Sequence, residues 1–317
     1  MQNMDNRIKE VTGAILNDYS QGRYIDKENN FSQPEKEAVV DIIEKLQKII
    51  FPGFYRMKDY RYYTVESMTS TLVEDVLFNL IKQITLSLRY SAEYCGLSDE
   101  ETAEKAHDQA FAFMERIPGI REYVDTDLTA EYDGDPAAYS KDEIVYSYPG
   151  FYAIVVYRIA HELVKLGVPL IPRMMTEHAH SLTGIDINPG ATIGKYFFID
   201  HGTGIVIGET TEIGEHVKLY QGVTLGALST RKGQLLKGKK RHPTIEDNVT
   251  IYSGASILGG ETVIGANSVI GANAFITTSV PAGAKISIKN QEMNCEDTSK
   301  KNLDNGDKFC NINSRIL

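Results

Sequence analysis

The chain has 317 residues, of which 42% are hydrophobic and 24% are charged, and this composition excludes a disordered, collagenous or fibrous protein. Its formal charge of -10, from 33 basic and 43 acidic residues, disfavours nucleic acid or an anionic membrane surface as the main partner, because phosphates would be repelled. No run approaches the roughly 20 apolar residues of a membrane span, and the first ten residues lack the apolar core of a signal peptide. We therefore expect a soluble cytoplasmic protein with no membrane partner.

The first half of the chain has helical periodicity. Apolar residues recur at three- and four-residue steps in residues 34–50, 67–90 and 101–117, which predicts three amphipathic helices, the third ending near Pro118. A further helical pattern covers 119–132 and is followed by a turn at 133–136. Residues 151–167 and 172–184 predict a helical hairpin that is broken at 167–169.

From Ile185 onward the apolar period changes to six. The recurring residues are Ile187, Ile193, Ile199 and Ile205; after a two-residue insertion, Ile207, Ile213, Leu219 and Leu225; then Ile245, Ile251, Ile257, Ile264, Ile270 and Ile276. In a hexapeptide repeat of this kind each unit supplies one short strand, three units close a triangular coil, and the aliphatic residues fill the interior. A β-sandwich would instead show a period of two with uneven spacing. The pattern predicts a parallel β-helix.

The fold class is therefore α+β, with four segments in chain order. We expect an all-helical N-terminal domain over residues 1–148, a connecting helical hairpin over 149–184, a β-helix over 185–289 and a flexible polar tail over 290–317. The three cysteines, Cys95, Cys295 and Cys310, are few and far apart, so neither a disulfide framework nor a thiolate zinc site is expected.

Two motifs within the repeats make the pattern more specific. They are DHGTGIVIGET, which runs from Asp200 to Thr210, and Arg241-His242-Pro243. With the hexapeptide array they resemble serine O-acetyltransferases over roughly residues 130 to 290. The resemblance implies a left-handed β-helix and transfer of acetyl from acetyl-CoA to the L-serine hydroxyl, giving O-acetylserine for cysteine biosynthesis. Where the family commonly has a histidine before Pro189, this chain has Asn188, which leaves the role of that histidine open.

The chemistry of that transfer points to a histidine. A serine hydroxyl is a weak nucleophile until its proton is removed, and imidazole is best matched to that task near neutral pH. His201 follows the inward Ile199 on a rigid coil, which is a suitable place for a general base. Asp186 lies fifteen residues earlier, on the coil beneath, and is expected to accept the second imidazole N–H. The resemblance implies the same pair.

The remaining substrate residues follow from the second motif and from the resemblance. The resemblance places His242 in the same pocket as His201, where it helps to bind the amino acid. The guanidinium of Arg241 is suited to bidentate hydrogen bonding with the substrate carboxylate. The resemblance implies that Asp135 and Asp200 bind the substrate ammonium group. Glu209 is expected to support the residues that bind the substrate without contacting the substrate itself.

The acetyl-CoA site is expected beside the second motif. Six basic residues lie between Arg231 and Arg241 in an otherwise acidic protein, and Lys239 and Lys240 are candidates for its phosphates. The thin pantetheine arm is expected along small residues of the coils, which are Gly226, Ala227, Gly254 and Ala255. No metal is expected, since the two histidines of the motif at 178–180 are two residues apart on a helix and point in different directions.

Other functions stay open at this stage. They are an acetyltransferase for another acceptor such as a sugar or an antibiotic, a zinc enzyme resembling the γ-class carbonic anhydrases, and a non-catalytic scaffold. The carboxylate clamp disfavours the first, and the absence of two histidines five residues apart disfavours the second. The family resemblance further implies a homotrimer with sites between chains, pairing of trimers into a hexamer, feedback inhibition by cysteine, and docking of the C-terminal tail into O-acetylserine sulfhydrylase. That docking uses a terminal isoleucine, whereas this chain ends in Ile316-Leu317.

Overall fold

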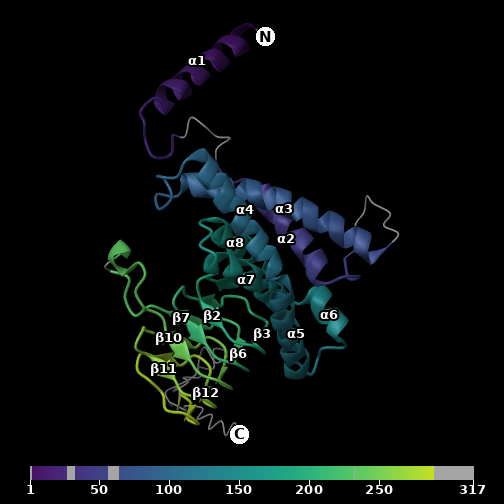
Figure 1. The fold of residues 1–317 in the computed structure, drawn as a ribbon. Helices are drawn as coiled ribbons and strands as arrows, with labels where there is room; N and C mark the ends of the chain where they lie inside the picture. Colours follow the sequence, from purple (N-terminus) through teal and green to yellow (C-terminus); the bar gives the residue numbers. More distant parts are fainter. Residues whose placement is uncertain (1, 27–32, 56–63, 232, 289–317) are drawn as a thin grey trace, which may run out of the picture. The chain divides into compact units, whose positions relative to one another are not determined.

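The structure is a computed structural model that describes residues 2–26, 33–55, 64–231 and 233–288 (Figure 1). The chain forms two compact units, one of residues 1–122 and 156–178 and the other of residues 123–155 and 179–317. The predicted tail at 290–317 lies outside the described residues, as do Cys295 and Cys310, and Cys95 is an exposed free thiol. Within the described ranges, no helix combines the length and the apolar character that crossing a membrane requires.

The part of the chain before the repeats is helical, as the apolar periodicity predicts. The described helices are α1 (Gln2–Tyr19), α2 (Lys36–Ile50), α3 (Val65–Tyr90), α4 (Asp99–Glu115), α5 (Ile117–Gly134), α6 (Lys141–Ser147), α7 (Pro149–Lys165) and α8 (Ile171–Thr183). In the first unit α3 packs against both α2 and α4. Its core contains Ile42, Leu46, Val76, Leu80 and Phe113, each fully buried, so the predicted amphipathic faces form the helix contacts.

One helix boundary differs from the expectation. The sequence suggests that a helix ends near Pro118 and that the next begins at residue 119, but α5 already begins at Ile117. Pro118 thus occupies the first turn of α5, where the missing N–H has no intrahelical partner to lose. The proline marks the start of a helix, not a break after one.

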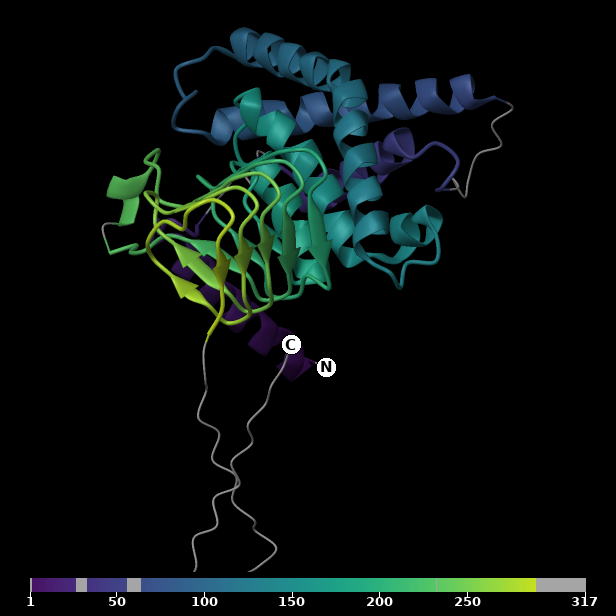
Figure 2. The same ribbon diagram turned by 90° about the horizontal axis from the view of Figure 1, so that it is seen from below.

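The second unit contains the predicted parallel β-helix (Figure 2). Its strands form three parallel sheets, one on each side of the coil. Face A contains β1 (Asp186–Ile187), β4 (Val206–Ile207), β7 (Thr224–Gly226), β10 (Ser256–Leu258) and β13 (Phe275–Ile276). Face B contains β2 (Thr192–Ile193), β5 (Glu212–Ile213), β8 (Thr244–Ile245) and β11 (Val263–Ile264). Face C contains β3 (Phe198–Asp200), β6 (Lys218–Tyr220), β9 (Thr250–Ile251), β12 (Val269–Ile270) and β14 (Lys285–Ile286).

The hexapeptide aliphatics form the interior of this β-helix. Register pairs join like positions of successive coils, as Ile187 to Ile207 on face A and Ile199 to Leu219 on face C. All fourteen aliphatic positions of the repeat are at most 8% exposed. Burial of about 25 cal/mol per Å² of apolar surface makes this column the main source of stability of the unit.

The first edge between faces C and A is longer than the edge above it. Five residues, 201–205, join β3 to β4, whereas three residues, 221–223, join β6 to β7. Ile205 and Ile207 are both buried, so the two extra residues leave the core intact. His201, Thr203 and Gly204 of this connection are exposed, whereas Gly202 is buried, and His201, Gly202 and Gly204 have positive φ. The insertion seen in the sequence therefore creates a protruding corner that carries His201.

Helix α5 covers the open edge of β3. The N–H of Phe197 donates to Asp127 Oδ1 at 2.9 Å, and the N–H of Ile199 donates to Glu131 Oε1 at 3.3 Å. Both carboxyl side chains are fully buried. Exposed N–H groups of an edge strand would otherwise template pairing with another strand. β3 is the end strand of face C, so no further strand accepts hydrogen bonds on its open side. The side chains of Asp127 and Glu131 accept them instead and hold in place the strand that ends at Asp200, directly before His201.

Candidate functional site

His201 lies at the protruding corner, immediately after β3. Its backbone has a φ of 59°, an unusual conformation for a residue other than glycine that recurs at functional sites. Its side chain is 70% exposed, and Nδ1 lies 3.1 Å from Oδ1 of Asp200, whose side chain is 20% exposed. A carboxylate at Nδ1 leaves Nε2 as the ring nitrogen that can take a proton from an incoming hydroxyl.

Asp135 is the second predicted anion of this corner. Its Oδ1 accepts a hydrogen bond from the N–H of Ala137 at 2.8 Å, and its Oδ2 accepts one from the Tyr148 hydroxyl at 2.6 Å. These two bonds, with a smaller contribution from His201, lower the pKa of the Asp135 carboxyl. The same contact raises the pKa of Tyr148. Asp135 therefore closes the turn at 135–138, which follows α5 and lies two residues later than the predicted turn at 133–136, and it holds a negative charge near His201.

Glu131 lies behind these two aspartates on the same helix as Asp127. Burial raises its pKa well above the ordinary range, against the lowering effect of the Ile199 hydrogen bond, and the charges of Asp127, Asp200 and Asp135 raise it further. Its Oε2 is buried without a hydrogen-bond partner among the described residues. The geometry and the charge both favour a neutral carboxylic acid at this position.

We expect Glu131→Gln to make the protein more stable than the wild type at pH 8. Because the folded-state pKa is raised, the folded protein holds a proton that the unfolded chain releases above its own pKa near 4.3, so wild-type stability falls as the pH rises above that value. Glutamine keeps the acceptor oxygen for Ile199 and removes the titration. Urea unfolding at pH 5 and pH 8 should show a stabilising difference that shrinks toward pH 5. A variant less stable than wild type at pH 8 would contradict a neutral Glu131.

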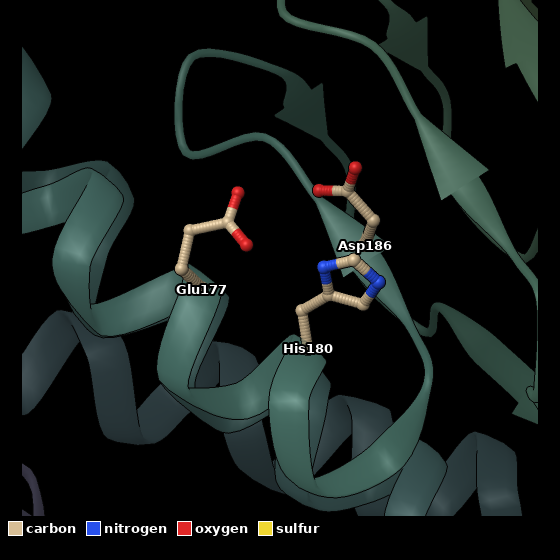
Figure 3. Close-up of side chains that lie close together, drawn as sticks. All are labelled: Glu177, His180 and Asp186. Atoms are coloured by element: carbon tan, nitrogen blue, oxygen red, sulfur yellow. The ribbon is translucent and has the colours of Figure 1, made fainter.

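Asp186, the predicted partner of His201, lies on β1 opposite Val206 of β4. A carboxylate oxygen of Asp186 and a ring nitrogen of His180 lie within 4.8 Å of each other, and Figure 3 shows this pair, with Glu177 one turn before His180 on α8. Asn188 Oδ1 accepts the N–H of Gly190 at 3.0 Å and so closes the turn after β1. The carboxylate at His201 Nδ1 is Asp200, and the pairing of His201 with Asp186 stays a prediction.

A second group of predicted residues surrounds the end of the long loop between β7 and β8. Arg241 forms an ion pair with Glu209, so these two predicted residues lie side by side. Lys240 Nζ lies 3.1 Å from Glu212 Oε1 and donates to the carbonyl oxygen of Thr210 at 2.7 Å. These two contacts of Lys240 attach the loop to the β-helix. The contact of Lys240 with the phosphates of acetyl-CoA stays a prediction.

His242 is buried in this second group. Its Nδ1 accepts a hydrogen bond from the N–H of Thr210 at 3.0 Å. Burial, followed by the positive charge of Arg241, lowers the pKa of His242 to about 4; Lys240 adds to this effect and Glu209 opposes it. The ring is therefore neutral near pH 7, with its hydrogen on Nε2.

Within one chain the two groups occupy different edges of the β-helix. His201 lies on the edge between faces C and A, because it follows β3 and precedes β4. Thr210 and His242 lie on the edge between faces A and B, because they join β4 to β5 and β7 to β8. The topology of a single chain therefore places the two histidines at separate edges of the β-helix.

The residues predicted to bind acetyl-CoA are also divided between these two edges of the β-helix. Gly226, Ala227, Lys239 and Lys240 lie at the edge between faces A and B, whereas Gly254 and Ala255 precede β10 at the edge between faces C and A. A cavity of about 590 Å³ lies at the first of these edges. It is lined by Ala227, Leu228, Leu236, Arg241, Gly259 and Thr262, among others. Small residues and one guanidinium make it suitable for a thin chain that carries an anionic group.

Sequence reasoning missed three residues that position the site. Glu131 accepts the N–H of Ile199 in β3, Tyr148 donates to Asp135, and Thr210 contacts the loop at 240–242. The only local signal for Glu131 is its four-residue spacing from Asp127 and Asp135, which places the three acids on one side of a helix. Thr210 ends the DHGTGIVIGET motif, but its contacts with residues 240–242, like that of Tyr148 with Asp135, depend on the fold and not on a short-range pattern.

Known proteins with sequences similar to this chain are named serine acetyltransferases. No protein-family model matches the sequence. The plasmid-encoded serine acetyltransferase of Synechococcus elongatus is 44% identical over 260 residues, which are 80% of this chain and 81% of the relative. The serine acetyltransferase of Bacillus subtilis is 48% identical over 128 residues, which are 40% of this chain and 56% of the relative.

Solved structures agree with these sequence relatives. Serine acetyltransferase isoform 3 of Entamoeba histolytica, in complex with cysteine, matches with a TM-score of 0.70 and 34% identity over 93% of this chain and 96% of its own. The serine acetyltransferase of Neisseria gonorrhoeae, in complex with serine, matches with a TM-score of 0.50 and 27% identity over 78% of this chain and 95% of its own. The resemblance carried by the two sequence motifs is thus confirmed, and the chain belongs to the serine acetyltransferases, a family of acyltransferases.

Proposed function

We propose that the chain transfers the acetyl group of acetyl-CoA to the hydroxyl of L-serine, with His201 as the general base. The observation that carries the proposal is His201 at an exposed, protruding corner, with Asp200 at 3.1 Å from Nδ1 and Asp135 nearby. Similar solved proteins bind serine and cysteine, which supports a small α-amino acid as the ligand of this corner.

The proposed step begins with the serine hydroxyl at His201 Nε2. The ring takes the hydroxyl proton as the oxygen attacks the thioester carbonyl, and the resulting imidazolium is stabilised by the carboxylate at Nδ1. Collapse of the tetrahedral intermediate expels the CoA thiolate, which His201 protonates. The products are O-acetylserine and CoA.

The charged residues around the corner are suited to the two ends of an amino acid. Asp200 and Asp135 provide negative charge for the ammonium group. Arg241 provides a planar guanidinium for the carboxylate, and Glu209 orients it. The neutral His242 adds an Nε2–H donor on the carboxylate side.

We propose that this site is completed between copies of the chain in a homotrimer. Within one chain, His201 and His242 lie on different edges of the β-helix, so the corner of one copy meets the loop end of the next. In a cyclic trimer the same contact recurs three times, which gives three equivalent sites. The 590 Å³ cavity beside Arg241 then receives the pantetheine arm of acetyl-CoA next to that site.

An acceptor panel tests the proposed function. Release of free thiol from acetyl-CoA should be fastest with L-serine, slower with homoserine, and at background with glycerate, which lacks the ammonium group that Asp200 and Asp135 are proposed to bind. L-Cysteine should compete with serine, because it carries the same ammonium and carboxylate. A sugar acceptor that outcompetes serine would overturn the proposal.

A further inference from the structure

We propose that Thr210 is a positioning residue that fixes His242 as the Nε2–H tautomer and anchors the loop that carries Arg241 and His242. The consequence for substrate binding rests on the proposed function, because it requires Arg241 and His242 to contact the amino acid. The placement of Thr210 itself rests only on hydrogen bonds within the second unit.

The hydroxyl of Thr210 has all of its hydrogen-bonding capacity used by the returning loop. Its oxygen accepts the backbone N–H of Arg241 at 2.9 Å and that of His242 at 3.1 Å. It also lies 2.9 Å from Nδ1 of the His242 ring. A hydroxyl has two lone pairs and one hydrogen, so with both lone pairs occupied the hydrogen is directed to Nδ1.

The backbone of Thr210 acts on the same ring nitrogen. The N–H of Thr210 donates to Nδ1 of His242 at 3.0 Å, so Nδ1 carries no hydrogen. Two donors on Nδ1 leave the ring hydrogen on Nε2, and this nitrogen lies against Gly208. The charged groups around the ring are Arg241, Lys240 and Glu209. Thr210, a residue of the β-helix coil, therefore determines which ring nitrogen of His242 carries the hydrogen.

The loop needs such an anchor because it is long. The residues between β7 and β8 include one short 3-10 helix, Gly233–Leu236, whose residues are not buried. At its end, Lys240 Nζ donates to the Thr210 carbonyl oxygen at 2.7 Å, so the N–H, the carbonyl and the hydroxyl of Thr210 all bind residues 240–242. Ordering a long loop at its last residues costs conformational entropy that these bonds offset.

Thr210→Val tests the inference and Thr210→Ser is its matched control. Valine keeps the shape and the backbone N–H but removes the hydroxyl, which leaves the N–H groups of Arg241 and His242 without their acceptor. We expect Thr210→Val to raise the KM for serine at least about tenfold while kcat changes less than about threefold, the pattern of lost ground-state binding. Serine keeps the hydroxyl, so Thr210→Ser should resemble the wild type, as should Thr192→Val at an exposed position on β2.

Nitrogen-15 NMR of the imidazole groups, assigned with His242→Gln, provides a readout independent of activity. In the wild type and in Thr210→Ser, we expect His242 near pH 7 to be a single neutral Nε2–H tautomer. Valine keeps the backbone N–H that donates to Nδ1 but removes the hydroxyl that binds residues 241 and 242, so in Thr210→Val we expect the Nε2–H tautomer to persist while the His242 ring signals shift or broaden, in a protein with unchanged circular dichroism. An Nδ1–H or protonated His242 in the wild type, or unaltered ring signals and an unaltered KM in Thr210→Val, would overturn the inference. Failure to acetylate serine by a wild type that has the expected tautomer would contradict the proposed function alone.

Discussion

His201→Ala is expected to lower kcat/KM for serine at least about a hundredfold, the usual scale for the loss of a general base. The effect should appear mainly in kcat, because His201 acts on the hydroxyl proton and the charged ends of serine have other partners. Its side chain is 70% exposed and lies outside the packed interior, so the melting temperature should change little. Thiol release from acetyl-CoA measures the activity, and a variant with more than a tenth of wild-type activity would remove His201 from the mechanism.

Two isosteric variants separate the candidate partners of His201. Asp200→Asn removes the charge 3.1 Å from Nδ1, and Asp186→Asn removes the charge that sequence reasoning placed there. If Asp200 stabilises the imidazolium, its variant loses kcat and Asp186→Asn retains most of it. The opposite order would restore the predicted pairing with Asp186. At saturating serine, the residual rate in His201→Ala should not fall further with either change, because the imidazolium is absent, and the loss of ammonium binding in Asp200→Asn should appear in KM alone.

Mixing two inactive variants tests whether the site lies between chains. His201→Ala and Arg241→Ala change different edges of the β-helix. If one copy supplies His201 and the next supplies Arg241, mixed trimers formed by co-refolding contain some interfaces with both wild-type residues, and activity returns. Refolding each variant alone is the control. No recovery from mixed trimers that contain both chains would contradict a shared site.

Gly208→Ala is expected to raise the KM for serine at least about tenfold and to destabilise the protein by about 1–3 kcal/mol, the range for overpacking a filled space. A β-carbon at this position would lie 2.1 Å from Cδ2 and 2.3 Å from Nε2 of His242. Because the backbone hydrogen bonds of Gly208 hold it in the coil, the histidine ring must move instead. The displaced ring then loses its place beside Thr210.

The matched control is Gly119→Ala. Gly119 lies in α5, and nothing lies within 4 Å of where its β-carbon would be. Alanine favours helix more than glycine does, so this variant should be as stable as the wild type or more so. Thermal unfolding and serine kinetics of the two variants give the comparison. Wild-type kinetics in Gly208→Ala would show that the position of the His242 ring does not matter for the reaction.

The sequence alone determined the β-helix and the family of this protein. A period of six with aliphatic residues is a local property of the chain, and it predicted the residues that fill the interior, from Ile187 to Ile276. The motif from Asp200 to Thr210 also singled out His201 as the candidate base, whereas the long connection that carries it was seen only in the structure. The motifs around His201 and His242 identified the serine acetyltransferases, which the relatives confirm.

Only the tertiary structure decided which side chains meet. The family resemblance placed His201 and His242 in one pocket, whereas within a single chain the two residues lie on different edges of the β-helix, with face A between those edges. The sequence also could not find Glu131 beneath β3 or Thr210 beneath the loop, since those contacts join residues 68 and 32 positions apart. Local periodicity sets which way a side chain faces, whereas the partner it meets depends on how distant coils and helices are stacked.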